Sequence, residues 1–113
     1  MTIYVSLAIA DGMFPEEVVA VRLPMTVREA KDFIEMGVVS CCNPSHALTL
    51  EALRTKHGIS VPIPEKAPFV TLKKGDKLIV LSARFPRRLA EGEVWTAEDV
   101  DKAEFKFGYW DIK

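Results

Sequence analysis

The segment FVTLKKGDKLIVLSA, residues 69–83, decides the fold. It holds two apolar runs on either side of the tetrapeptide KKGD (73–76), whose Gly-Asp pair is typical of a tight turn. The segment therefore predicts two strands that form a β-hairpin. Before it, the stretch 59–68 contains three prolines and is predicted to be a loop. After it comes the basic, turn-rich connection RFPRRLAEGE (84–93).

Further strands are predicted toward both ends of the chain. Residues 2–10 are rich in Ile, Val and Leu and alternate little, which indicates a strand covered on both faces. After an Asp-Gly turn, EEVVAVRL (16–23) predicts a second strand. VVSCC (38–42) is a short extended piece or a loop, and EFKFGYWDI (104–112) alternates as a half-exposed final strand. Together these segments predict a mixed β-sheet.

Two segments carry the signals of capped helices. In TVREAKDFIEMG (26–37), Thr26 is the predicted N-cap, Glu29 completes a capping box and Gly37 ends the helix. The segment TAEDVDKA (96–103) predicts a short capped helix near the end of the chain.

The segment NPSHALT begins a further helix. Asn43 is its predicted N-cap with Pro44 at the first helical position, Ser45 is the alternative cap, and Gly58 ends the helix. Strands and helices together predict an α/β (α+β) fold. We expect one small domain, residues 1–113, in which a mixed sheet is flanked by two or three helices.

Length and charge narrow the classes of protein. A chain of 113 residues fits one domain. The formal net charge of −1 argues against a general DNA or RNA coat, which needs a broad basic field, but it is compatible with a local anion pocket. The apolar N-terminal run lacks a basic region before it, and no segment approaches the length of a membrane span. We therefore expect no signal peptide and no membrane anchor.

The two cysteines, Cys41 and Cys42, are neighbours in the sequence. Adjacent cysteines rarely reach good disulfide geometry, so a disulfide framework is excluded. No Cys-x-x-Cys motif occurs, which argues against a zinc ribbon or a thioredoxin-type site. The pair is predicted to be two small half-buried thiols in a reducing cytoplasm.

His46 is the first candidate for chemistry. It lies in the first turn of its helix, beside free backbone N–H groups and the positive end of the helix dipole. That place disfavours an imidazolium but attracts phosphate, and a bound anion would make the ring easier to protonate, as a general acid requires. A structural histidine is the alternative, and no second ligand has a spacing that suits a metal. His57 is at the C-terminal end of the same helix, where the helix dipole stabilises a cation, and it is predicted to be structural.

The second candidate is a group of arginines. Arg84, Arg87 and Arg88 lie within five residues and are followed by Glu91. Guanidinium groups bind phosphate oxygens in a bidentate manner. The glutamate could hold an arginine in place or interact with a hydroxyl group of the ligand. The alternative is a solvated surface turn. No Walker loop, dinucleotide glycine motif or nucleophile elbow occurs.

The stretches SHALTLEALRTKHGISVP and GDKLIVLSARFPRRLAEGEVWTAEDV resemble one known family. These are the small viral ring nucleases of archaeal viruses and phages, with cellular relatives, which degrade cyclic tetra-adenylate and act as anti-CRISPR proteins against type III systems. The family has a His with a Thr three residues later, as His46 and Thr49 stand here. Its Arg-Leu-Pro-Glu-Gly motif resembles the stretch 88–92. The resemblance covers nearly the whole chain.

The resemblance implies a metal-independent reaction without a cofactor, in which a ribose 2′-OH attacks its own 3′-phosphate. His46 would protonate the leaving 5′-oxygen, Arg88 would hold the phosphate, and Glu91 would orient groups or assist the 2′-OH. A C2 homodimer would bind the cyclic oligoadenylate across its interface, with the active sites at or near that interface. Further expected ligand-binding residues are Ser45, Thr49, Arg84, Arg87, Lys66 and Ala10. The implied location is the cytoplasm, that of the host cell if the protein is viral.

The sequence departs from the family pattern where the family contacts its ligand. Leu7 and Ala10 stand at positions where the family usually has Asn and Ser, and Ser45 replaces a Gly. Lys66 is the nearest basic residue to an expected arginine. Two alternatives to the nuclease therefore stay open. One is a protein that binds a cyclic or adenine nucleotide without cutting it, and the other is an interaction domain in which His46 is structural.

Overall fold

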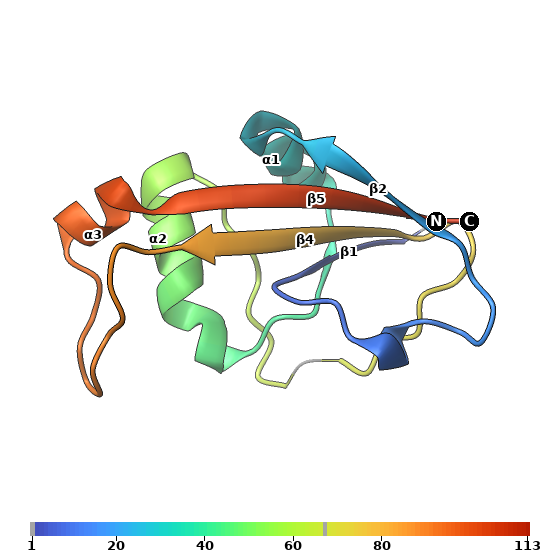
Figure 1. Cartoon of the computed structure of the whole chain (residues 1–113), viewed down its shortest axis with the longest axis horizontal. Helices are drawn as coiled ribbons and strands as arrows, with labels where there is room; N and C mark the ends of the chain where they lie inside the picture. Colours follow the sequence, from blue (N-terminus) through green and yellow to red (C-terminus); the bar gives the residue numbers. More distant parts are fainter. Residues whose placement is uncertain (1, 67) are drawn as a thin grey trace.

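The strand β4 (Lys77–Arg84) lies in the middle of a five-stranded mixed sheet of order β2-β5-β4-β1-β3 (Figure 1). The computed structural model describes residues 2–66 and 68–113. The other strands are β1 (Ile3–Ser6), β2 (Ala20–Met25), β3 (Val39–Ser40) and β5 (Glu104–Ile112). The helices are α1 (Val27–Met36), α2 (Ala47–His57) and α3 (Ala97–Lys102), and the 3-10 turns are η1 (Asp11–Met13) and η2 (Pro44–His46). The predicted α+β fold is confirmed.

The hairpin predicted at residues 69–83 is wrong, because β4 takes other partners. It pairs in parallel with β1 and antiparallel with β5. The residues before the turn stay outside the sheet, and the backbone N–H of Leu72 donates to the carbonyl of Met13 at 2.7 Å. The turn itself forms, with Gly75 at a φ of 92°, a conformation that favours glycine.

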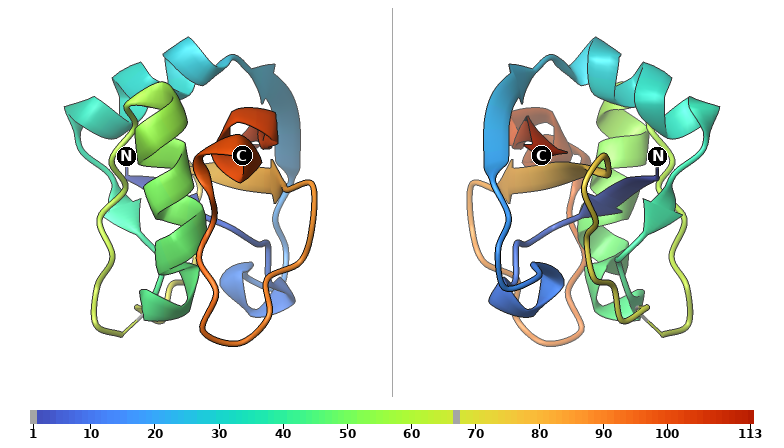
Figure 2. Two further views of the ribbon diagram at one scale, coloured as in Figure 1. Left: turned by 90° about the vertical axis from the view of Figure 1, so that its left-hand side faces the viewer. Right: turned by 90° about the vertical axis from the view of Figure 1, so that its right-hand side faces the viewer.

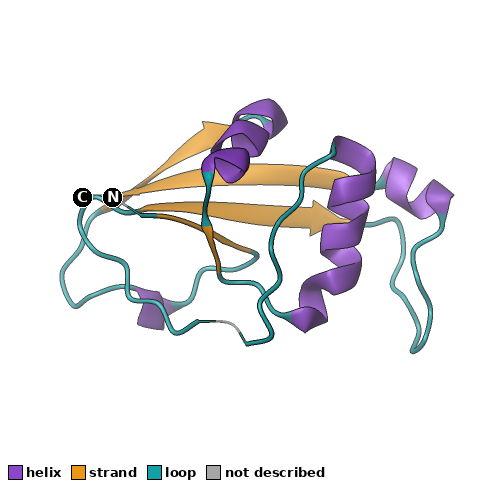
Figure 3. Ribbon diagram, turned by 180° about the vertical axis from the view of Figure 1, so that it is seen from behind, coloured by secondary structure: helices purple, strands orange, loops and turns teal. Residues whose placement is uncertain are grey.

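Apolar side chains cover both faces of β4. Its neighbouring residues Leu78 and Ile79 point to opposite faces and are both fully buried. On one face, α1 and α2 lie over the sheet (Figure 3). The larger cluster there includes Val5, Ala30, Ile34, Leu50, Leu53, Leu81, Phe105 and Phe107. On the other face, Leu78, Leu72 and Ile112 form a smaller cluster with apolar residues of the 13–20 segment. A strand covered on both faces needs a central place in the sheet.

Two strands differ from their predicted limits. β1 ends at Ser6 rather than at residue 10, because the Ser6 hydroxyl donates to the carbonyl of Ala8 at 2.8 Å and accepts from its N–H at 3.3 Å. This bond bends the chain away from the sheet. β2 begins and ends later than predicted and contains Pro24. β2 lies at the edge of the sheet beside β5. An edge strand tolerates a proline, which lacks a backbone N–H, because one side of the strand has no neighbouring strand to bond.

The predicted helix caps are confirmed. In α1 the Thr26 hydroxyl accepts from the N–H of Glu29, and the Glu29 carboxylate accepts from the N–H of Thr26. α3 has the same capping box between Thr96 and Asp99. None of the helices in the described part of the chain is long and apolar enough to cross a lipid bilayer.

Candidate functional site

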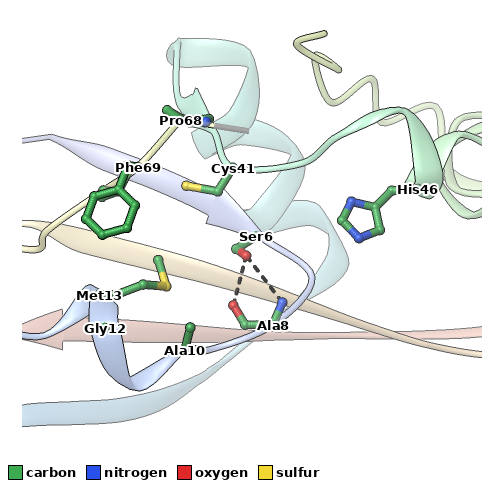
Figure 4. A pocket seen from close by; sticks show the side chains of 10 residues that line it. Ser6, Ala8, Ala10, Gly12, Met13, Cys41, His46, Pro68 and Phe69 are labelled. Carbon is green, nitrogen blue, oxygen red and sulfur yellow. Dashed lines mark hydrogen bonds between the residues drawn. The ribbon is translucent and has the colours of Figure 1, made fainter. Parts of the chain in front are cut away.

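A pocket of about 300 Å³ lies beyond the carboxyl ends of the parallel strands β1 and β3, beside the start of α2 (Figure 4). Ligands of sheets with parallel strands commonly bind at this end. The segment after β1, the residue after β3, η2 and the chain before the 73–76 turn contribute the lining. The lining residues are Ser6, Ala8, Ala10, Gly12, Met13, Cys41, His46, Pro68, Phe69 and Val70.

The lining is mostly apolar, and several of its polar groups already have partners. The Ser6 hydroxyl both donates to and accepts from the backbone of Ala8 (Figure 4). The carbonyl of Ala10 accepts from the N–H of Met13 at 3.0 Å. Among the lining side chains that the structure describes, the imidazole of His46 and the thiol of Cys41 are then the polar groups left for a ligand.

Cys41 contributes a neutral thiol to the pocket. Burial raises the pKa of this half-buried cysteine, and the neighbouring Cys42 raises it further. Cys42 is fully buried, which raises its pKa as well, and its N–H donates to the Ser40 hydroxyl at 3.2 Å. Both cysteines are free, and neither has the thiolate character of a nucleophile.

His46 is held by the cap of its own turn. Asn43 is an N-cap as predicted, but of the 3-10 turn η2, with Pro44 inside the turn. The helix predicted to start here begins only at Ala47, and His46 is the N-cap of α2. The Asn43 carboxamide oxygen accepts from the N–H of Ser45 at 2.9 Å and from the Ser45 hydroxyl. In return, Nδ1 of His46 accepts from the N–H of Asn43 at 3.2 Å. The half-buried imidazole extends from η2 toward the end of β1 (Figure 4).

The predicted basic group lies elsewhere, at the end of the sheet that carries α2 and α3 (Figure 2). Arg87 is engaged there with two carboxylates. It pairs with Asp99 at 2.9 Å and with Glu93 at 3.1 Å. Hydrogen bonds from the backbone N–H groups of Ala90 and Thr96 lower the pKa of Glu93 and Asp99 respectively, and Arg87 lowers the pKa of both carboxyl groups further. The three residues tie the loop between β4 and α3 to the first turn of α3. Sequence reasoning missed both carboxylate partners because they lie six and twelve residues away.

Arg88 and Glu91 lie on the same loop, and both are exposed. In the part of the chain that the structure describes, neither forms an ion pair, and neither lines the pocket of His46. Arg84, at the end of β4, lines a separate hollow with Ser82, Ala83, Glu104 and Lys106. One subunit therefore does not bring the predicted arginines and His46 together.

The other predicted ligand-binding residues are spread around the pocket. Ala10 lines it. Ser45 is exposed and bound to Asn43, Thr49 is half-buried in the first turn of α2, and Lys66 is exposed in the loop before the pocket. None of these three belongs to the described lining. Leu7 instead packs against the larger apolar cluster.

Sequence reasoning missed Phe69 as a pocket residue. Its side chain is 97 % exposed at the edge of the pocket, although the predicted hairpin placed it in a strand. An exposed aromatic ring offers a flat apolar surface, but nothing in a single sequence distinguishes it from a buried one. Within the described residues, no three His, Cys, Asp or Glu side chains lie close enough together to hold a metal ion.

Comparison with known proteins gives the family. The model of the STIV B116-like family matches residues 6–107. The chain belongs to the STIV B116-like family. Among solved structures it is similar to B116 of Sulfolobus turreted icosahedral virus, with a TM-score of 0.71 at 14 % identity over 98 % of this chain and 99 % of B116. No curated protein sequence matches it. The expected relation to a family of small viral proteins is confirmed, and the nuclease activity stays a prediction.

Proposed function

We propose that this protein is a metal-independent ring nuclease that cleaves a cyclic oligoadenylate, most plainly cyclic tetra-adenylate, and so switches off type III CRISPR signalling. One observation carries the proposal: His46 and Ala10, both expected at the ligand from the family resemblance, line one pocket at a helix start. A helix start attracts phosphate, and an apolar pocket accepts the face of a nucleobase.

The proposed reaction is an internal transesterification. The ribose 2′-oxygen forms a bond to the adjacent phosphorus as the bond to the 5′-oxygen breaks, which leaves a 2′,3′-cyclic phosphate and a free 5′-hydroxyl. The 2′-OH loses its proton to a base, with Glu91 or solvent as acceptor, and His46 supplies a proton to the 5′-oxygen. Arg88 stabilises charge on the phosphate, and positioning supplies much of the rate. Two such cuts convert the ring into linear di-adenylates.

A homodimer is part of the proposal. Arg88 and Glu91 are exposed on a loop outside the pocket that holds His46, so a single chain offers an incomplete set of groups. A four-fold cyclic ligand contains a two-fold axis, and a C2 dimer can therefore surround it with two copies of each group. Sedimentation with and without the cyclic nucleotide measures this assembly, and a monomer that cleaves would contradict it.

The first experiment incubates the pure protein with cyclic tetra-adenylate in EDTA and follows di-adenylate by mass spectrometry. We expect cleavage without metal, and no cleavage of an analogue that lacks the 2′-OH. Intact ligand at micromolar enzyme would contradict the proposal.

A matched pair of variants separates binding from proton transfer. In His46→Gln, the amide can still donate a hydrogen bond from about the position of Nε2 but cannot protonate an alkoxide, so we expect binding with a loss of about 10²–10⁴-fold in cleavage rate. His57→Gln, at the other end of the same helix, is the control and should cleave as the unaltered protein does.

A second candidate function is a protein that binds the same signal without cutting it. Ala8 and Ala10 favour it, because they give the pocket apolar contacts where hydrogen-bonding groups would orient a ribose for in-line attack. Tight binding with intact ligand after long incubation would support this function, and His46→Ala would then leave the ligand equally protected.

A further inference from the structure

The capping box at η2 differs from the other two boxes in one respect. In α1 and α3 the side chain that accepts from the N-cap backbone is a carboxylate, Glu29 or Asp99. In η2 it is the imidazole of His46, whose Nδ1 accepts from the N–H of Asn43 at 3.2 Å. A carboxylate accepts hydrogen bonds throughout the neutral range, whereas an imidazole nitrogen accepts only while it carries no proton. This box can therefore open by protonation.

The hydrogen bond fixes the tautomer of the ring. A nitrogen that accepts has its lone pair free of hydrogen, so the ring hydrogen of neutral His46 lies on Nε2. In that form His46 is a hydrogen-bond donor to a ligand in the pocket. It is not a proton donor, because loss of the Nε2 hydrogen would leave an imidazolate. Transfer to a leaving oxygen requires the imidazolium, in which a hydrogen on Nδ1 would face the N–H of Asn43.

We infer that the Asn43–His46 capping box acts as a switch in the site. In the closed state, it holds His46 as a neutral hydrogen-bond donor that binds the ligand. In the open state, the ring is free to become the cation that donates a proton. Asn43 is thus a positioning residue of His46. The role in proton transfer rests on the proposed function, whereas the closed tautomer rests on the hydrogen bond alone.

The proton movements balance. A solvent proton enters at Nδ1 as the bond from Asn43 opens, and the Nε2 hydrogen passes to the 5′-oxygen as its bond to phosphorus breaks. The ring is then neutral with its hydrogen on Nδ1. Exchange with solvent returns the hydrogen to Nε2, and the box closes again.

The described lining of the pocket places no negative charge beside His46. Cys41 is the other titratable group among these lining residues, and burial raises the pKa of its thiol. A phosphate bound in the pocket would therefore supply the negative charge that faces the ring in the open form.

Nuclear magnetic resonance of the imidazole nitrogens of the full chain tests the inference directly. In the ligand-free protein at neutral pH, we expect His46 with an unprotonated Nδ1 and a protonated Nε2. A ring with its hydrogen on Nδ1 would overturn the inference. Because no nucleotide is needed, this result does not depend on the proposed function.

Adding the 2′-deoxy analogue of cyclic tetra-adenylate should then shift the ring toward double protonation, and a bound analogue that leaves the tautomer unchanged would contradict opening by the anion.

Two variants test the positioning role. Asn43→Ala removes the acceptor for Ser45 and loosens the box, so we expect a larger share of the Nδ1–H tautomer and a change in the pH profile of single-turnover cleavage. Thr26→Ala breaks the equivalent box of α1 and is the control for lost helix stability. If both variants leave the tautomer of His46 as it was, Asn43 does not position the ring.

Discussion

The two ends of α2 each carry a histidine, and the two rings experience opposite surroundings. His46, at the N-terminal end, is bound through Nδ1 and lines a pocket. His57, at the C-terminal end, packs edge-on against Phe105 with 5.6 Å between ring centroids. Burial lowers the pKa of His57, and the charge of Lys56 lowers it further.

The comparison shows that helix position alone does not decide the state of a histidine. The dipole favours a cation at the C-terminal end, which is the basis of the sequence prediction for His57. In the structure, burial lowers the pKa of His57 and the charge of Lys56 lowers it further, both in the opposite sense to the effect of the helix end. At the N-terminal end, a hydrogen bond rather than burial fixes the ring.

The largest expected effect separates the two ends by function. His46→Ala should lower cleavage of cyclic tetra-adenylate by about 10²–10⁴-fold, because it removes the proposed proton donor. His57→Ala should leave cleavage unchanged and lower the free energy of unfolding by about 1 kcal/mol through loss of the Phe105 contact. Single-turnover cleavage and urea denaturation of both variants make the comparison. Equal loss of cleavage in both would contradict separate roles for the two ends.

The middle of α2 offers a variant that should alter neither ring. Leu53 is fully buried in the larger apolar cluster, so Leu53→Ala should lower the free energy of unfolding by about 2–5 kcal/mol. Cleavage per folded molecule, measured well below the melting temperature, should stay close to that of the unaltered protein. A loss of cleavage in folded protein would show that the pocket depends on packing further along the helix.

A smaller effect is expected where the C-terminal end of α2 meets α3. Lys56 donates to the carbonyls of Asp101 and Ala103 there, and Asp99 holds both Arg87 and the start of α3. Asp99→Asn should lower the melting temperature because it weakens the ion pair and the cap together. Glu98→Gln, which alters an exposed carboxylate paired with Lys102, is the control and should change the melting temperature little. Equal shifts for the two variants would contradict the role assigned to Asp99.

The smallest effect concerns pH. The pKa of His57 is lower in the folded protein than its ordinary value of 6.5, so between these values the unfolded chain binds more protons. Stability should therefore fall as the pH drops below about 6.5. His57→Gln should flatten this dependence in denaturation curves between neutral and mildly acidic pH. A curve as steep as that of the unaltered protein would assign the dependence to another group.

Local signals in the sequence predicted local structure. The Thr26 capping box, the short capped helix over 96–103 and the cap at Asn43 depend on residues three or fewer positions apart, and each is confirmed. The hairpin at 69–83 failed because it required a choice between partners. A Gly-Asp turn is compatible with pairing to the preceding segment, but burial of both faces of β4 is satisfied by β1 and β5, which are distant in sequence.

The site was predictable only in part. His46 and Ala10 were named from the sequence and line the pocket. The state of His46 depends on a backbone N–H at Asn43, which no side-chain pattern reveals. Arg87 could be named as a cation, but its engagement with Asp99 depends on how the loop returns to α3.

The pairing of β2 has a consequence for the order of folding. β2 comes early in the sequence, yet its neighbour in the described sheet is β5 (Glu104–Ile112), far along the chain. The backbone N–H of Lys113 also donates to the carbonyl of Val19 just before β2. Contacts between segments so distant in sequence form late, because closing the long loop between them costs conformational entropy. We therefore expect β2 to join the sheet only after β5 has paired with β4.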